Sequence, residues 1–182
     1  MNEQLEFVKQ IASRLDSARI PYMMTGSMAM GLYAVPRMTR DIDVVIECQP
    51  DDAATIAALF EDDCYVDVES IREAATRQST FNIIHNEWII KADFIVRKDE
   101  EYRKVEFDRR RQFQIGGTPI WVVTPEDLIL SKIKWSQESN SEMQQRDILV
   151  LVESVTDLDW RYLQTWGERL GMKDLLDQVK RR

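Results

Sequence analysis

Two aspartates flank the start of an apolar run at Asp41-Ile42-Asp43, which continues as Val44-Val45-Ile46. The β-branched residues favour a strand, whereas aspartate is depleted in strands and a half-buried carboxylate is costly without a partner. Because side chains alternate along a strand, Asp41 and Asp43 would share one face, opposite Ile42. Two carboxylates about one pleat repeat apart can share a hard cation such as Mg²⁺, which prefers oxygen ligands.

A third aspartate lies inside another apolar run, Lys91-Ala92-Asp93-Phe94. Alternation places Lys91 and Asp93 on the face opposite Ala92. If this strand neighbours the one that begins at Asp41, the three carboxylates converge and raise one another's pKa. Divalent metal would relieve that conflict, and two ions would allow in-line phosphoryl or nucleotidyl transfer.

A glycine and a serine, Gly26-Ser27, stand between a short apolar segment at 22–25 and a segment at 28–33 that suits one or two helical turns. A glycine after a strand lets the backbone approach a phosphate, and the N–H groups of the following helix N-terminus point at it. The Ser27 hydroxyl adds a further donor. This segment is therefore a candidate phosphate-binding turn.

The composition limits the classes of protein to which the chain can belong. The chain has 182 residues, 44% of them hydrophobic and 31% charged, which predicts a folded chain of about one domain. A net charge of -8 argues against broad nucleic-acid binding but allows a local basic site or a small cationic substrate. No apolar run approaches the roughly 20 residues needed to span a bilayer, and the N-terminal segment lacks a signal peptide's apolar region. We therefore expect a cytoplasmic protein without membrane contact, with Cys48 and Cys64 as reduced structural thiols.

The pattern of elements predicts an α+β portion at 1–123 and a helical portion at 124–182. Thr124 as N-cap and Pro125 at the first helical position mark the change. No Gly/Ser/Pro-rich linker follows, so we expect the two portions to pack together. Strands are expected at 22–25, 41–47, 81–84, 88–96, 112–115 and 120–123. Helices are expected at 3–18, 28–33, 51–61, 69–77, 99–108, 125–138, 141–155, 158–170 and 172–180.

The succession of Gly26-Ser27, Asp41-Ile42-Asp43 and the later single acid Asp93 resembles the nucleotidyltransferase superfamily, which includes DNA polymerase beta and the aminoglycoside nucleotidyltransferases. The segments TGSMAMGLYAVPRMTRDIDVVI and TPEDLILSKIKW, with the later QQRDILVL, are most similar to the small prokaryotic branch. That branch holds abortive-infection type nucleotidyltransferase toxins and uncharacterised relatives. The resemblance covers roughly residues 20–155.

The resemblance implies a nucleotidyltransferase-like mixed β-sheet with flanking helices and a helical C-terminal part. It also implies that Gly26 and Ser27 hold nucleotide phosphates and that Asp41 and Asp43 bind Mg²⁺. Asp93 would complete the metal site or act as base. Two departures stand out: the gap between Ser27 and Asp41 is longer than in minimal members, and the Lys-plus-Arg motif of the toxins has no counterpart.

The implied activity is Mg²⁺-dependent transfer of a nucleoside monophosphate from an NTP, ATP or another ribonucleotide, with Mn²⁺ as an alternative ion. The acceptor, which the sequence does not identify, would be a small molecule, RNA or a protein. The rival hypothesis is a catalytically degenerate module that kept the fold and binds nucleotide or a partner. The oligomeric state and any toxin–antitoxin pairing are not indicated.

Several cations near these motifs have two interpretations each. Arg37 and Arg40 would contact the triphosphate or form salt bridges to the aspartates, and Lys91 would bind phosphate or pair with Asp93. Lys132 would contact nucleotide or form an ion pair with Asp147. In addition, His85 is expected in a hairpin turn, and Arg109-Arg110-Arg111 reads as a solvated run that could help bind RNA.

Overall fold

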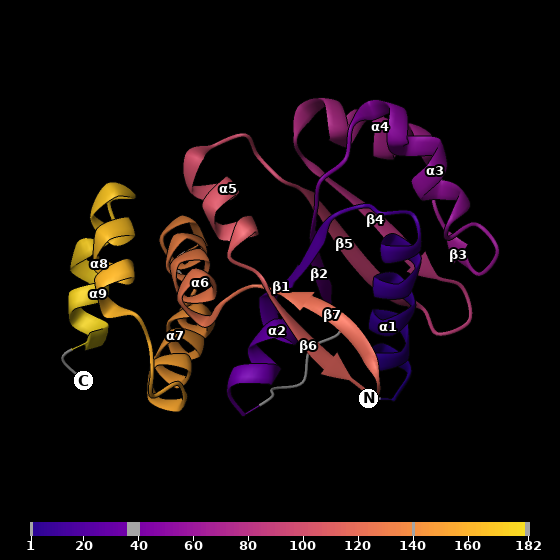
Figure 1. The fold of residues 1–182 in the computed structure, drawn as a ribbon. Coiled ribbons are helices and arrows are strands. Elements are labelled where there is room, and N and C mark those ends of the chain that lie inside the picture. Colours follow the sequence, from indigo (N-terminus) through magenta and orange to yellow (C-terminus); the bar gives the residue numbers. More distant parts are fainter. Residues whose placement is uncertain (1, 36–40, 140, 181–182) are drawn as a thin grey trace.

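The computed structural model describes residues 2–35, 41–139 and 141–180. Its centre is a seven-stranded mixed sheet with the strand order β3-β4-β5-β2-β1-β7-β6 (Figure 1). The strands are β1 (Tyr22–Thr25), β2 (Ile42–Ile46), β3 (Cys64–Tyr65), β4 (Thr80–His85), β5 (Ile90–Val96), β6 (Arg111–Ile115) and β7 (Thr118–Val122).

Helices alternate with the strands in the first part of the chain and form all of its C-terminal part. They are α1 (Asn2–Ser17), α2 (Gly26–Tyr33), the 3₁₀ turn η1 (Pro50–Asp52), α3 (Ala53–Ala58), α4 (Val68–Arg77), α5 (Glu101–Asp108), α6 (Pro125–Ser139), α7 (Glu142–Ser154), α8 (Trp160–Arg169) and α9 (Lys173–Lys180). From α6 onward the chain is helical, and these helices gather at one side of the molecule (Figure 1). The predicted α+β fold with a helical C-terminal part is confirmed.

The sheet pairs strands that lie far apart in the sequence. β1 runs antiparallel to β2 and parallel to β7. β2 runs parallel to β5, so the two strands that carry the predicted aspartates are direct neighbours. The remaining pairs, β5 with β4, β4 with β3 and β6 with β7, are antiparallel.

The alternation read from the sequence is present in β2. Ile42, Val44 and Ile46 have no exposed surface, whereas Asp43 and Val45 are half-buried on the other face. The core face of the sheet continues through aromatic contacts, in which Phe94 of β5 stacks with Phe81 of β4 at 5.1 Å between ring centroids. One face of the sheet therefore belongs to the core, and the other carries the acids.

The helix α6 is the buried centre of the C-terminal part. Leu128, Ile129 and Ile133 have no exposed surface and belong to the same hydrophobic core as the sheet. The α6 N-terminus is capped as expected, because the Thr124 Oγ1 accepts a hydrogen bond from the Asp127 backbone N–H at 3.3 Å. The division of the chain after residue 123 stays a prediction.

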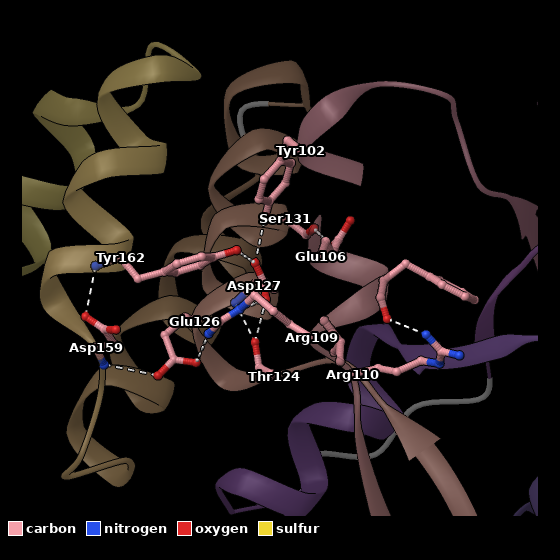
Figure 2. Close-up of polar contacts among 12 residues, drawn as sticks. Tyr102, Glu106, Arg109, Arg110, Thr124, Glu126, Asp127, Ser131, Asp159 and Tyr162 are labelled. Atoms are coloured by element: carbon pink, nitrogen blue, oxygen red, sulfur yellow. Dashed lines mark hydrogen bonds and ion pairs between the residues drawn. The ribbon is translucent and has the colours of Figure 1, made fainter. Parts of the chain in front are cut away.

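A buried carboxylate, Asp127, ties α5, α6 and α8 together (Figure 2). It accepts hydrogen bonds from the hydroxyls of Tyr162 and Thr124, both at 2.6 Å, and of Tyr102 at 3.2 Å. Arg109 adds its Nε at 3.0 Å, and its guanidinium also lies 3.8 Å from the Tyr162 ring centroid. A carboxylate without exposed surface needs such partners, and here it has four.

The expectation of a solvated arginine run is therefore wrong for two of its three members. Arg109 pairs with Asp127 and Glu126, and Arg110 lies over the rings of Phe107 and Trp121. Of the run, Arg111 is exposed, at the start of β6. The chain turns between α5 and β6, which directs the first two guanidinium groups inward.

The predicted hairpin is present between β4 and β5, but the assignment of His85 to its turn is also wrong. His85 is the last residue of β4 and only 4% exposed, since it continues the buried positions of Phe81 and Ile83. Its ring stacks on Trp88 at 3.9 Å and meets Phe7 edge-on at 5.3 Å. The turn lies one step later and contains Ile89 in the left-handed region. The short strand β3 was not foreseen.

Among the helices that the structure describes, we find none with the length and apolar character that crossing a membrane requires.

Candidate active site

Four polar residues form one row across four neighbouring strands. Asp43 of β2 is in register with Thr25 of β1 on one side and with Asp93 of β5 on the other. Asp93 is in register with Asn82 of β4. Residues in register on adjacent strands have side chains on the same face. The prediction that Asp43 and Asp93 come together is therefore correct, and Thr25 and Asn82 extend the row.

Asp41 lies just before β2 and is exposed. Its negative charge contributes to the environment of Asp43. Within the described ranges no group of three or more carboxylate, histidine or cysteine side chains is arranged to hold a metal ion. Mg²⁺, however, is commonly held by one or two carboxylates together with water and substrate phosphates. The donor set of Asp41 and Asp43 fits an ion that arrives with a nucleotide, and joint ligation by all three acids stays a prediction.

The electrostatic surroundings of Asp43 favour the binding of a cation beside its carboxylate. Burial raises the pKa of its carboxyl above the ordinary value, and the charges of Asp93 and Asp41 raise the pKa further. Lys132 and Lys91 act in the opposite direction. A bound cation would stabilise the ionised form of this carboxylate.

Both oxygens of Asp93 have donors from the protein. The Lys91 ammonium lies 2.7 Å from Oδ2. The Asn82 carboxamide donates to Oδ1 when its amide is oriented with the nitrogen toward Asp93, which is the orientation that satisfies both ends of the amide. The predicted ion pair of Lys91 with Asp93 is thus present, and a contact of Lys91 with phosphate stays a prediction.

Gly26 brings the start of α2 against Asp43. Its φ of +66° lies in the left-handed region, and a Cβ at this position would be 2.8 Å from the Asp43 Cγ and closer still to Oδ2. Only glycine allows this approach without strain. The first turn of α2, with half-buried Ser27, therefore begins directly beside the carboxylate. The helix α2 also accounts for much of the long gap between Ser27 and Asp41.

Lys132 lies on α6 and is 1% exposed. Its ammonium is 2.7 Å from the Asp147 Oδ2 and 3.2 Å from the Gln144 Oε1, both on α7. The predicted ion pair with Asp147 is thus present. Lys132 also acts on Asp43 electrostatically, so contact with a nucleotide stays a prediction.

Two predicted residues, Arg37 and Arg40, lie outside the described residues. Sequence reasoning did not identify Asn82 and Gln144, which contact Asp93 and Lys132 in the structure. The signal for Asn82 was its place on a strand beside β5, but that signal requires the register between strands, which the sequence does not contain.

Comparison with known proteins finds matches among solved structures and none among family models or curated proteins. Among solved structures, an antigenic nucleotidyltransferase-like protein from Paracoccidioides brasiliensis superposes with a TM-score of 0.63 at 20% identity, covering 99% of this chain and 93% of that one. The chain has the nucleotidyltransferase fold.

Two further neighbours, an antibiotic-resistance factor and an antibiotic adenylyltransferase, share this nucleotidyltransferase fold. The antibiotic-resistance factor ANT(2'')-Ia matches with a TM-score of 0.60 at 16% identity, over 100% of this chain and 99% of that one. The lincosamide antibiotic adenylyltransferase LnuA matches with a TM-score of 0.56 at 15% identity, over 84% and 98%. The resemblance stated from Gly26, Asp41, Asp43 and Asp93 is confirmed at the level of the fold.

Proposed function

We propose that the protein transfers a nucleoside monophosphate from an NTP to an acceptor in a Mg²⁺-dependent reaction. The observation that carries this proposal is the placement of Asp43 and Asp93 in register on adjacent strands, with the Gly26 turn against Asp43. Phosphate-binding glycine, helix N-terminus and paired carboxylates are the parts that nucleotidyl transfer needs.

Each residue has a place in this reaction. The N–H groups at the start of α2 and the Ser27 hydroxyl would bind the β- and γ-phosphates. Asp41 and Asp43 would hold Mg²⁺, and Mn²⁺ would substitute for it. When bound, the ion would supply positive charge that offsets the charge developing on the phosphates. Arg37, Arg40 and Lys132 are proposed as further phosphate contacts.

The reaction forms one bond and breaks one. The acceptor oxygen bonds to the α-phosphorus, and the bond from that phosphorus to the bridging oxygen breaks. Pyrophosphate leaves with the electron pair, and the proton of the acceptor passes to Asp93 or to solvent. Asp93 would in this way help to deprotonate the acceptor, unless it completes the metal site instead.

The acceptor class is proposed from the net charge and from the ligands of two structural neighbours. A net charge of -8 suits a neutral or cationic small molecule better than a polyanion. Two structural neighbours have antibiotic ligands in their solved structures, since LnuA is lincomycin-bound and ANT(2'')-Ia is in complex with adenylyl-2''-tobramycin. RNA and protein acceptors remain outcomes of the test below.

The test has two stages. ATP and the other ribonucleotides, each with Mg²⁺ or Mn²⁺, should raise the melting temperature by mass action. Asp43→Asn should remove the metal-dependent part of that rise, and exposed Asp62→Asn should not. Incubation with α-labelled NTPs in a host extract should then label an acceptor with wild type and not with Asp43→Asn. Nucleotide binding without any labelled product would count against the enzyme.

The second candidate is a degenerate nucleotide- or partner-binding module. The Lys91–Asp93 ion pair favours it, because Lys91 occupies one oxygen of a carboxylate that the enzyme would use. Such a module would bind nucleotide equally well with and without divalent metal. Metal-independent binding in calorimetry, unchanged by Asp43→Asn, would decide for it.

A further inference from the structure

The cation beside Asp93 is built into the same strand as its partner. Lys91 precedes Asp93 by two residues on β5, so alternation places both side chains on the acid-bearing face. Their ion pair measures 2.7 Å, with side-chain exposures of 42% for Lys91 and 21% for Asp93. The spacing along the strand thus places this positive charge on the same face as the row of carboxylates.

The carboxylates differ in what surrounds them. Asp93 has Lys91 on Oδ2 and the Asn82 amide on Oδ1. Asp43 has the Gly26 backbone against it and the charges of neighbouring acids around it. The other nearby lysine, Lys132, is 2.7 Å from Asp147. Positive charge from the protein is therefore placed directly on Asp93.

A divalent ion that bound Asp93 through Oδ2 would have to displace Lys91 or approach its ammonium closely. Like charges within a few ångströms repel strongly in a partly buried site. An exposed ion pair on a long side chain is weak by itself, but the two-residue spacing on β5 starts both side chains from the same face of the sheet.

We propose that Lys91 acts as a built-in cation at Asp93 that replaces one of two divalent ions. The site then holds a single ion, on Asp41 and Asp43 with the nucleotide phosphates. Asp93 then ligates no second ion, and its role is to help deprotonate the acceptor. This inference rests on the proposed function.

The experiment counts Mn²⁺ ions by electron paramagnetic resonance and calorimetry, on the full chain with α,β-methylene ATP. Wild type and Lys91→Arg should bind one ion per chain. Lys91→Met should gain a second binding step that wild type lacks, because the repulsion is removed. Lys98→Met, an exposed lysine beyond the end of β5, is the matched control and should bind one ion. A second ion in wild type, or an unchanged count in Lys91→Met, would overturn the inference.

The same titrations without nucleotide separate this inference from the proposed function. If calorimetry shows no binding of α,β-methylene ATP, the proposed function fails. The role of Lys91 is still tested without nucleotide, because Lys91→Met should bind Mn²⁺ at least about tenfold more tightly than wild type does. Adding Asp93→Asn to Lys91→Met should remove that gain. Equal affinities in wild type and Lys91→Met would refute the role of Lys91.

Discussion

The backbone of Gly26 lies so close to the Asp43 carboxylate that a Cβ on Gly26 would come within 2.8 Å of the Asp43 Cγ. The glycine also adopts a left-handed φ of +66°. Two requirements therefore meet at one residue: a conformation that other residues adopt with strain, and a space that any side chain would fill. The close approach places the start of α2 beside the carboxylate that we propose as a metal ligand.

Gly26→Ala should displace Asp43 and destabilise the fold. The left-handed conformation alone costs a residue with a side chain roughly 1 to 2 kcal/mol, and the clash adds to it. Gly171→Ala is the matched control, because Gly171 has φ +71° but no atom within 4 Å of the added Cβ. Chemical denaturation and calorimetry with an NTP and Mg²⁺ measure both effects. Only Gly26→Ala should lose metal-dependent nucleotide binding, and equal losses would show that the contact with Asp43 does not matter.

Lys132 and Asp147 should be mutually dependent for stability. An exposed pair would have contributed about 1 kcal/mol or less, but these side chains are 1% and 5% exposed. Removing one partner of a buried pair leaves an uncompensated charge, which costs about 3 to 5 kcal/mol. Lys132→Ala and Asp147→Ala should therefore each unfold at markedly lower denaturant concentration.

The double variant Lys132→Met/Asp147→Leu separates stability from chemistry. It should recover most of the lost stability, because no unpaired charge remains. If Lys132 also stabilises the leaving pyrophosphate, turnover should stay about 10²-fold or more below wild type. Turnover that returns together with stability would remove Lys132 from the proposed site.

The sequence predicted the parts of the site that depend on local pattern. Alternation in β2 and β5 and the glycine before α2 could be read from neighbouring residues. The register that joins Asp43 to Asp93 could not, since it links parallel strands whose paired residues are 50 positions apart, with five elements between them. The family resemblance supplied this pairing as an expectation, and the structure supplied its partners, Asn82 and Lys91.

The wrong predictions have a common physical reason. A run of arginines looks solvated until the chain turns, and Arg109 then reaches Asp127, which is 18 positions away. His85 looked like a turn residue because Asn86 and Glu87 follow it, yet one more residue of strand puts its ring in the core. Long-range burial decides such positions, and local sequence does not record it.

The ion pair between Arg14 of α1 and Asp63 predicts a pH dependence. Two hydrogen bonds of 2.8 and 2.5 Å join them, and the Arg14 guanidinium lowers the pKa of Asp63 from 3.8 to about 2. The folded-state pKa is depressed, so this contribution to stability is complete above pH 3.8 and is lost as pH falls toward 2. Asp63→Asn should lower the unfolding free energy by about 1 to 2 kcal/mol at pH 7, after allowance for solvent screening.

Denaturant titrations of wild type and Asp63→Asn between pH 7 and pH 2 measure this effect. The difference between the two proteins should shrink as the pH falls below 3.8. Exposed Asp62→Asn, one position earlier, is the control and should show little difference at any pH. A difference between wild type and Asp63→Asn that stayed constant with pH would show that the side chain contributes by packing and not by its charge.

The hydroxyl of Tyr162 is the shortest link between α8 and the buried carboxylate Asp127, at 2.6 Å (Figure 2). Tyr162→Phe keeps the ring, which packs under the Arg109 guanidinium, and removes this one donor. A hydrogen bond to a charged group contributes about 1.5 to 3 kcal/mol, so the variant should lose stability in that range. Tyr65→Phe is the control, because Tyr65 is 62% exposed and its change should stay within about 0.5 kcal/mol.

Since Asp127 also orients α6, which carries Lys132, hydrogen exchange should show α8 and the first turn of α6 opening together in Tyr162→Phe. Exchange that rises in α8 alone would show that the remaining donors, Thr124 among them, hold α6 without it.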